Sequence, residues 1–235
     1  MWNIRVVFLA LVVLASPALA NDFDDARDWM VKTQIVGSDR RISDPKTIHA
    51  MSKVPRHEFV PERYLKQAYD DYPLPIGFGQ TISQPYIVAL MTQLLELKGK
   101  EEERVLEVGT GSGYQAAILA EITKDVYTVE IIPELQKQAA DRLKRLGYEK
   151  IIAAHRDGYY GWEEHAPYDA IIVTAAADHV PPPLLRQLKD GGRLIIPVGP
   201  QGAVQTLWLI RKQGDRLKWI NQGAVRFVPL VRKSE

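Results

Sequence analysis

A short apolar run that ends in three closely spaced glycines constrains the fold of this chain more than any other segment. Residues 105–108 read Val-Leu-Glu-Val, and Gly109, Gly111 and Gly113 follow before a helical pattern begins at Tyr114. Glycines in such a loop permit a tight turn and let backbone N–H groups approach a ligand closely. The segment therefore predicts a buried strand, a ligand-binding loop and the start of a helix.

Short apolar runs alternate with helical patterns along the rest of the chain. We expect strands at residues 104–108, 126–131, 151–154, 170–173 and 193–198, and helices at 85–97, 114–122, 133–146 and 183–188. An antiparallel pair, 204–210 and 217–228, is expected to turn at Gly214-Asp215. Strands that alternate with helices form a parallel sheet covered on both faces. The predicted fold class is therefore α/β, a doubly wound Rossmann-like sheet.

The part of the chain before this alternation has a different organisation. Helical patterns occupy residues 25–35 and 45–54, and prolines and glycines then interrupt the chain repeatedly up to residue 79. We expect residues 21–82 to form a helical and loop segment that packs on a core formed by residues 83–235.

The first twenty residues have the three parts of a secretory signal peptide. Arg5 precedes ten consecutive apolar residues, 6–15, and the triplet Ala18-Leu19-Ala20 follows. The run is shorter than the ~20 residues that span a bilayer. We expect cleavage after Ala20, a periplasmic or secreted mature protein, and no stable membrane insertion after cleavage. The alternative is an uncleaved N-terminal helix.

Composition excludes several function classes. Lysine and arginine total 30 against 29 acidic residues, so no basic excess favours nucleic acid as a partner. Cysteine is absent, which excludes disulfides, thiolate metal ligands and a cysteine nucleophile. The five histidines are scattered along the chain, and we expect no metal site.

Two acidic residues after later strands indicate an adenosine-type ligand. Glu130 lies near the end of the second expected strand, 21 residues after Gly109. A carboxylate at about this separation accepts hydrogen bonds from a ribose, and its two oxygens match two vicinal hydroxyls. Asp157-Gly158 follows the third strand at the same edge of the sheet, where an acid can accept from an adenine amino group. The G-x-G-x-G spacing, with Tyr114 in place of a final glycine, departs from the dinucleotide fingerprint.

Two further residues each have a structural and a functional interpretation. Glu107 interrupts an apolar strand, and it either ties the glycine loop or contacts the ammonium end of a ligand. Ser83 precedes Pro85 at the start of a helical pattern. It either caps that helix, or its hydroxyl and the free N–H groups of the helix terminus bind a carboxylate.

Several segments together resemble the protein-L-isoaspartate O-methyltransferases. The segment around Ser83 is specific to that family, whereas the glycine loop is shared by many methyltransferases. The similar stretches are residues 74–85, 105–114, 157–162, 168–177 and 225–230. The resemblance covers roughly residues 48–230. There are two departures: Val231 stands where many members carry threonine, and the signal-like start is not typical of this mostly cytoplasmic family, so a cytoplasmic location is the alternative.

The resemblance implies a class I S-adenosylmethionine-dependent fold, with a seven-stranded sheet and a C-terminal antiparallel strand. It implies methyl transfer from S-adenosylmethionine to the free carboxylate of L-isoaspartyl residues in damaged proteins and peptides. Ser83 would be the active-site serine, Glu107 and the glycine loop would hold the methionine part, Glu130 the ribose and Asp157 the adenine. The implied cofactor-binding residues are Thr81, Ile82, Glu107, Gly109, Thr110, Gly111, Ser112, Gly113, Glu130, Asp157 and Gly158.

Three alternatives stay open at this point. A nicotinamide-dependent oxidoreductase requires the G-x-G-x-x-G spacing that Tyr114 breaks. A methyltransferase acting on nitrogen usually carries an Asn/Asp-Pro-Pro-aromatic motif after the fourth strand, where this chain has Thr174 followed by three alanines. A non-catalytic protein that retains the fold would show no thermal stabilisation by S-adenosylmethionine or its demethylated product.

Overall fold

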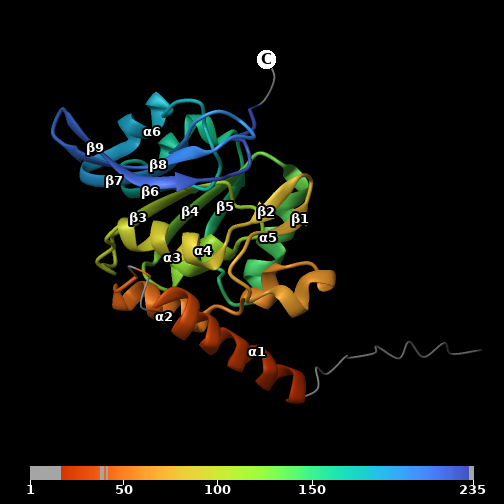
Figure 1. Ribbon diagram of the computed structural model, residues 1–235. Helices are drawn as coiled ribbons and strands as arrows, with labels where there is room; N and C mark the ends of the chain where they lie inside the picture. Colours follow the sequence, from red (N-terminus) through yellow and green to blue (C-terminus); the bar gives the residue numbers. More distant parts are fainter. Residues whose placement is uncertain (1–16, 38–39, 41, 233–235) are drawn as a thin grey trace, which may run out of the picture.

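A seven-stranded sheet forms the centre of the protein (Figure 1). The computed structural model describes residues 17–37, 40 and 42–232, so residues 1–16 of the predicted signal peptide lie outside the described residues. The strand order is β5-β4-β3-β6-β7-β8-β9. The strands are β3 (Arg104–Val108), β4 (Asp125–Glu130), β5 (Ile152–His155), β6 (Tyr168–Val173), β7 (Leu188–Val198), β8 (Gln205–Gln213) and β9 (Arg216–Val225).

The direction of the strands confirms the predicted topology. Strands β3 to β7 are mutually parallel, β8 is antiparallel to β7, and β9 is antiparallel to β8. The turn between β8 and β9 lies at Gly214-Asp215, as expected. Strand β7 is longer than expected because it begins at Leu188 and includes Gly191-Gly192, where the pairing with β6 is irregular.

Side chains along each strand alternate between two hydrophobic layers, as the period of a strand requires. Val105 packs with the larger cluster, and Leu106 and Val108 pack with the smaller one on the opposite face. The larger cluster lies under α1 (Pro17–Trp29), α2 (Pro45–Lys53), α3 (Pro85–Leu94), α4 (Tyr114–Ala120) and α5 (Pro133–Arg145). The smaller one lies under α6 (Pro182–Gln187). Both faces are covered, which confirms the doubly wound arrangement.

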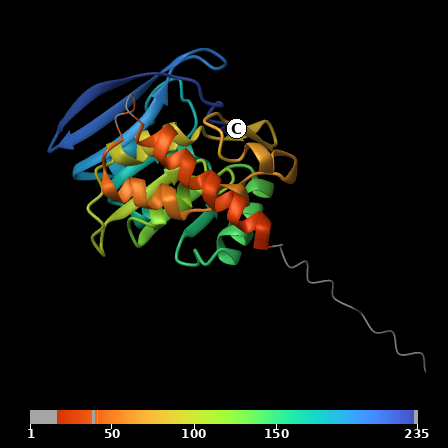
Figure 2. The ribbon, with the colours of Figure 1, turned by 60° about the horizontal axis from the view of Figure 1, so that its bottom comes forward.

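Two helices differ from the expected ranges for local reasons. Helix α1 begins at Pro17 instead of residue 25, because proline suits the first turn and the Ala-Leu-Ala triplet favours helix. It therefore runs across the bond after Ala20 and continues as a π-helical turn, Met30–Ile35. Helix α3 ends at Leu94, before Glu96 adopts a positive φ of 50°. Figure 2 shows α1 and α2 on the outer side of the helical layer.

A short hairpin that the sequence patterns did not predict leads into the region of Ser83. It consists of β1 (Leu74–Gly77) and β2 (Gln80–Ile82), and residues 77–79 form its turn with positive φ values. Four short 3₁₀ helices in the described part of the chain were also not predicted. They are Arg56–Phe59, Glu62–Gln67, Gly158–Tyr160 and Glu163–His165.

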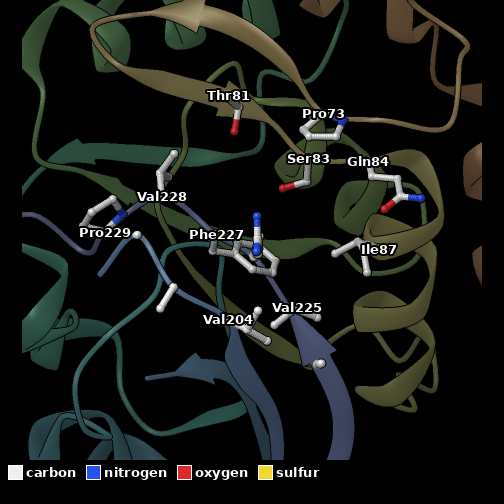
Figure 3. Close-up of a pocket in the computed structure, with 14 residues that line it drawn as sticks. Pro73, Thr81, Ser83, Gln84, Ile87, Val204, Val225, Phe227, Val228 and Pro229 are labelled. Carbon is white, nitrogen blue, oxygen red and sulfur yellow. The ribbon is translucent and has the colours of Figure 1, made fainter. Parts of the chain in front are cut away.

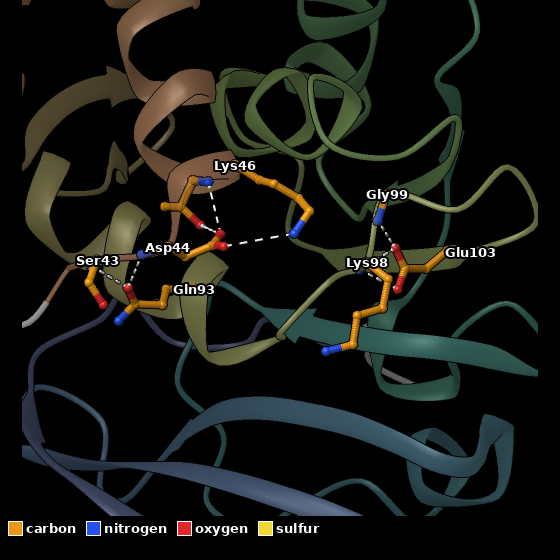
Figure 4. Close-up of polar contacts among 8 residues, drawn as sticks. Ser43, Asp44, Lys46, Gln93, Lys98, Gly99 and Glu103 are labelled. Atoms are coloured by element: carbon orange, nitrogen blue, oxygen red, sulfur yellow. Dashed lines mark hydrogen bonds and ion pairs between the residues drawn. The ribbon is translucent and has the colours of Figure 1, made fainter.

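Side-chain acceptors hold the chain at the start of α2 and after the end of α3 (Figure 4). Gln93 Oε1 accepts hydrogen bonds from the N–H groups of Ser43 and Asp44, at 2.6 and 2.8 Å, and so fixes the start of α2 against α3. The Glu103 carboxylate accepts the N–H groups of residues 98 and 99 at 2.8 Å. These bonds set the turn from α3 into β3.

A fully buried arginine joins the N-terminal segment to the rest of the core. Arg56 Nε donates to the Ala68 carbonyl at 2.8 Å, and Nη2 donates to the Ser83 carbonyl at 2.7 Å. Its guanidinium also lies over the ring of Tyr114, 4.9 Å from the centroid. Burial lowers the pKa of Arg56. One side chain thus connects the first 3₁₀ helix, the end of the hairpin and the start of α4.

We expect Arg56→Met to lower the free energy of unfolding by about 2–5 kcal/mol, because two buried carbonyl groups lose their donor. Denaturant unfolding of the variant and the parent measures this change. Arg63→Met is the matched control, since Arg63 is exposed, and it should change stability by less than about 0.5 kcal/mol. Equal effects of the two substitutions would contradict the connecting role of Arg56.

Candidate functional site

The glycine loop follows β3 at the point where the order of the sheet reverses. Strand β3 pairs with β4 on one side and with β6 on the other, and ligands of open α/β sheets bind outside the carboxyl ends at such a point. The N–H groups of Gly109 and Thr110 donate to the Val129 carbonyl at 2.9 and 3.2 Å. A Cβ atom on Gly109 would lie 2.5 Å from Thr174 Oγ1, so this position requires glycine.

The carboxylate of Glu130 organises the backbone around it. Oε2 accepts the N–H of Gly111 at 2.8 Å, and Oε1 accepts those of Ile131 and Ile132 at 2.9 and 3.0 Å. A carboxylate has about four acceptor positions, and three of them are occupied. One acceptor position, on Oε2, is left for a ligand hydroxyl, and the binding of a ribose by Glu130 stays a prediction.

The two oxygens of Glu107 have different surroundings, and the contacts of one of them agree with the structural interpretation. The Thr128 hydroxyl donates to Oε2 at 2.5 Å and lies 2.6 Å from the Thr110 hydroxyl, which ties the carboxyl group to the glycine loop. Oε1 is buried and has no hydrogen-bond partner among the described residues. Burial raises the pKa of Glu107 to about 8. A cationic ligand group beside Oε1 would supply the missing partner.

Two adjoining cavities bring most of the predicted site residues together. The first, of about 30 Å³, is lined by Thr81, Ile82, Ser83, Glu107 and residues 109–112. The second, of about 50 Å³, is lined by Thr81, Gly109, Gly111, Glu130 and Gly158. Among the predicted site residues, Gly113 and Asp157 line neither cavity. Sequence analysis missed further lining residues: Gln80, Ile131, Ile132, Thr174, Ala175 and the C-terminal residues 228–231.

Gly113 and Asp157 both lie at positions where they stabilise the local structure. Gly113 adopts the left-handed conformation, with φ 90°, at the start of α4. The Asp157 carboxylate accepts the N–H of Tyr159 at 3.0 Å and pairs with Arg232 Nε at 3.2 Å. Arg232 also lies over the Tyr159 ring, 3.6 Å from its centroid. Asp157 therefore joins the C-terminal segment to the loop after β5.

Ser83 does not cap α3, which corrects one of its two interpretations. The N-cap is Gln84, and no side chain makes the capping hydrogen bond. The N–H of Tyr86 in the first turn donates to Asp71 Oδ1 at 3.0 Å. The helix terminus thus already has a carboxylate from the chain itself. The Ser83 hydroxyl has no hydrogen-bond partner within the described residues, while its carbonyl is held by Arg56.

A larger open pocket lies beside these cavities and shares two residues with the first. It has a volume of about 750 Å³, and both Thr81 and Ser83 line it. Figure 3 shows the Ser83 hydroxyl pointing into it. The rest of its lining is mainly apolar and comes chiefly from α3, the loop between β7 and β8, the end of β9 and the C-terminal segment. Its members include Ile87, Val204, Val225, Phe227, Val228 and Pro229. Ser83 therefore stands between a narrow polar cavity and a wide apolar pocket.

Within residues 17–37, 40 and 42–232, no three histidine, aspartate or glutamate side chains gather to hold a metal ion. In the same part of the chain no helix has the length and apolar character needed to cross a membrane.

The buried carboxyl of Glu107 predicts a pH dependence of stability. A glutamate ionises near pH 4.3 in the unfolded chain, whereas its pKa is about 8 in the folded protein. The folded state therefore holds a proton that the unfolded state has lost, and the parent loses stability as pH rises between these values. Glu107→Gln lacks this loss, so its stability relative to the parent should increase by up to about 1.4 kcal/mol per pH unit.

Denaturant unfolding of the parent and of Glu107→Gln between about pH 5 and pH 8 measures this difference. A stability difference that stays constant across the range would show that the Glu107 carboxyl titrates normally.

Comparison with known proteins identifies the family. A family model described as protein-L-isoaspartate(D-aspartate) O-methyltransferase matches residues 31–235. Protein-L-isoaspartate O-methyltransferase 1 of Cupriavidus necator is 52% identical, over 97% of this chain and 92% of that protein. The protein-L-isoaspartate O-methyltransferase of Opitutus terrae is 51% identical, over 97% of this chain and 98% of that protein.

Solved structures show the same fold. A protein-L-isoaspartate O-methyltransferase superposes with a TM-score of 0.77 at 32% identity, over 88% of this chain and 65% of that longer chain. A Plasmodium falciparum structure described as a beta-aspartate methyltransferase, in complex with S-adenosyl-L-homocysteine, gives a TM-score of 0.74 at 26% identity, over 89% of this chain and 98% of that chain. With the match over residues 31–235 and relatives half identical along nearly their whole length, the chain belongs to the protein-L-isoaspartate(D-aspartate) O-methyltransferase family.

Proposed function

We propose that this chain carries out the reaction for which its family is named. It transfers a methyl group from S-adenosylmethionine to the free carboxylate of L-isoaspartyl residues in damaged proteins and peptides. The observation that carries the proposal is the position of Ser83, which lines both the glycine-loop cavity and the wide apolar pocket. A donor bound on one side of Ser83 and an acceptor bound on the other would meet there.

The residues around the glycine loop fit the methyl donor. S-adenosylmethionine supplies a methyl group on a positively charged sulfur, and its amino acid part carries an ammonium group. Glu107 Oε1 is a buried acceptor without a partner among the described residues and suits that ammonium. The remaining acceptor position on Glu130 Oε2 suits one ribose hydroxyl. Ile131 and Ile132 line the cavity beside Glu130 and provide apolar surface for the adenine base.

The acceptor chemistry explains why the site needs no general base. A carboxylate is already ionised at neutral pH, since its unperturbed pKa is about 4. The enzyme has to hold the carboxylate in line with the methyl group and to exclude water. A serine hydroxyl can do the first by donating a hydrogen bond. Ser83 therefore positions the acceptor and forms no covalent intermediate.

Family membership counts against the other functions that the sequence left open. The nicotinamide-dependent oxidoreductase and the nitrogen methyltransferase both require motifs that this chain lacks, and its half-identical relatives are named as O-methyltransferases. The near balance of charge gives no support to a nucleic-acid substrate. The mainly apolar lining of the wide pocket suits a polypeptide with hydrophobic neighbours around the isoaspartyl residue.

Substitution of the serine tests this assignment. We expect Ser83→Ala to lower the turnover of an isoaspartyl peptide about a hundredfold, because a misplaced acceptor reacts slowly. Stability should change by less than about 0.5 kcal/mol, because the hydroxyl makes no hydrogen bond within the described residues. Methyl-transfer rate, cofactor affinity and unfolding are measured on the same preparations. Ser43→Ala is the control, since Ser43 is exposed and lines neither the two cavities nor the wide pocket. Near-parent turnover of Ser83→Ala would leave the acceptor site unassigned.

We also propose that the chain is exported. Arg5, the apolar run 6–15 and the triplet Ala18-Leu19-Ala20 support a cleaved signal peptide. Cleavage after Ala20 would leave the stacking of Phe23 on His57, with ring centroids 4.1 Å apart, in place. The mature protein would then act on damaged proteins outside the cytoplasm.

The mass of the mature protein tests export. Expression of the full chain in a bacterium with an outer membrane should give a periplasmic protein that begins at Asn21. Ala20→Phe should block cleavage, because the residue before the cleaved bond must be small. A full-length chain found only in the cytoplasm would contradict the proposal.

A further inference from the structure

The wide pocket contains one charged side chain that the proposed reaction does not use. Fourteen residues line the pocket, and Arg226 is the charged one among them. It follows β9 and is exposed. Among the described residues it has no ion pair or hydrogen-bonded partner for its guanidinium, in contrast to Arg193 and Arg211, which both pair with Glu96.

The backbone that follows Arg226 is fixed by hydrogen bonds. The N–H of Phe227 donates to Gln205 Oε1 at 2.9 Å, and the Val228 carbonyl accepts the N–H of Ala176 at 2.8 Å. Gln205 itself is buried. Arg226 is therefore a long cationic side chain on an anchored segment, at the wall of the pocket into which Ser83 points (Figure 3).

We infer that Arg226 is a specificity-determining residue that binds a carboxylate of the substrate polypeptide. The inference rests on the proposed function. A guanidinium recognises carboxylates through paired N–H donors. Arg226 is the cationic side chain among the residues that line the pocket, and most of the others are apolar. Two carboxylates of the substrate share this chemistry: the isoaspartyl carboxylate itself, and the side chain of a neighbouring aspartate or glutamate.

The chemistry of the reaction indicates that Arg226 acts on the binding of the substrate. Methyl transfer removes negative charge from the carboxylate, so a cation paired with it stabilises the bound substrate more than the transition state. Loss of Arg226 should therefore raise KM for the peptide without lowering kcat. Arg226 is distinct from Ser83 in this respect, because loss of Ser83 should lower turnover.

The experiment compares Arg226→Gln, Arg226→Lys and Arg226→Glu with the parent on two isoaspartyl peptides, one with neutral neighbours and one with an adjacent glutamate. We expect KM to rise about tenfold in Arg226→Gln, more in Arg226→Glu, and to recover partly in Arg226→Lys. Added salt should raise KM of the parent more than that of Arg226→Gln. Arg216→Gln is the control, since Arg216 is an exposed arginine at the other end of β9, outside the pocket.

The two peptides distinguish the source of the carboxylate. An equal rise of KM on both peptides identifies the isoaspartyl carboxylate, and a rise confined to the acidic peptide identifies the neighbouring side chain. Direct peptide binding, measured by fluorescence anisotropy in the presence of S-adenosyl-L-homocysteine, gives a readout that does not depend on turnover. Unchanged KM and unchanged binding in folded Arg226→Gln would overturn the inference. A parent that binds the peptides without methylating them would contradict the proposed function instead.

Discussion

The glycine loop depends on the Glu130 carboxylate at the end of β4. That carboxylate gathers three backbone N–H groups, from Gly111, Ile131 and Ile132, so that one side chain fixes both the loop after β3 and the turn into α5. The same hydrogen bonds limit what Glu130 can offer a ligand, because they occupy three of about four acceptor positions. A residue expected from its spacing to bind a ribose is thus also a structural element of the loop, and its substitution would change both roles.

The acceptor side of the site depends on a different buried group. Arg56 donates a hydrogen bond to the Ser83 carbonyl and lies against Tyr114, the first residue of α4. Arg56 therefore fixes the position of Ser83 relative to the helix that follows the glycine loop. Asp71 meanwhile accepts the N–H of Tyr86 at the start of α3. Because Arg56 binds the Ser83 carbonyl and Asp71 accepts the N–H at the start of α3, neither task requires the Ser83 hydroxyl. That hydroxyl remains available to a substrate. The N-terminal segment therefore contributes to the site as well as covering the sheet.

Sequence analysis was most successful where the signal is local. The strands of the parallel sheet, the loop at Gly109 and the turn at Gly214-Asp215 follow from residue types over a few positions. It failed where an interaction joins distant segments. Asp71 and Tyr86 are fifteen residues apart, and Asp157 and Arg232 are 75 residues apart, so no periodicity indicates either contact. The hairpin β1–β2 was missed because its strands are four and three residues long and proline lies in the first.

The C-terminal segment forms one wall of the cavity beside the glycine loop. Residues 228–231 form part of its wall, and they are held there by the hydrogen bonds of Ala176 with Val228 and Leu230 and by the contacts of Arg232 with Asp157 and Tyr160. Val228 and Pro229 line both this cavity and the wide pocket beside Ser83. The same anchored segment therefore shapes the cavity beside Glu130 and the pocket into which the Ser83 hydroxyl points, so a change in its position would alter both.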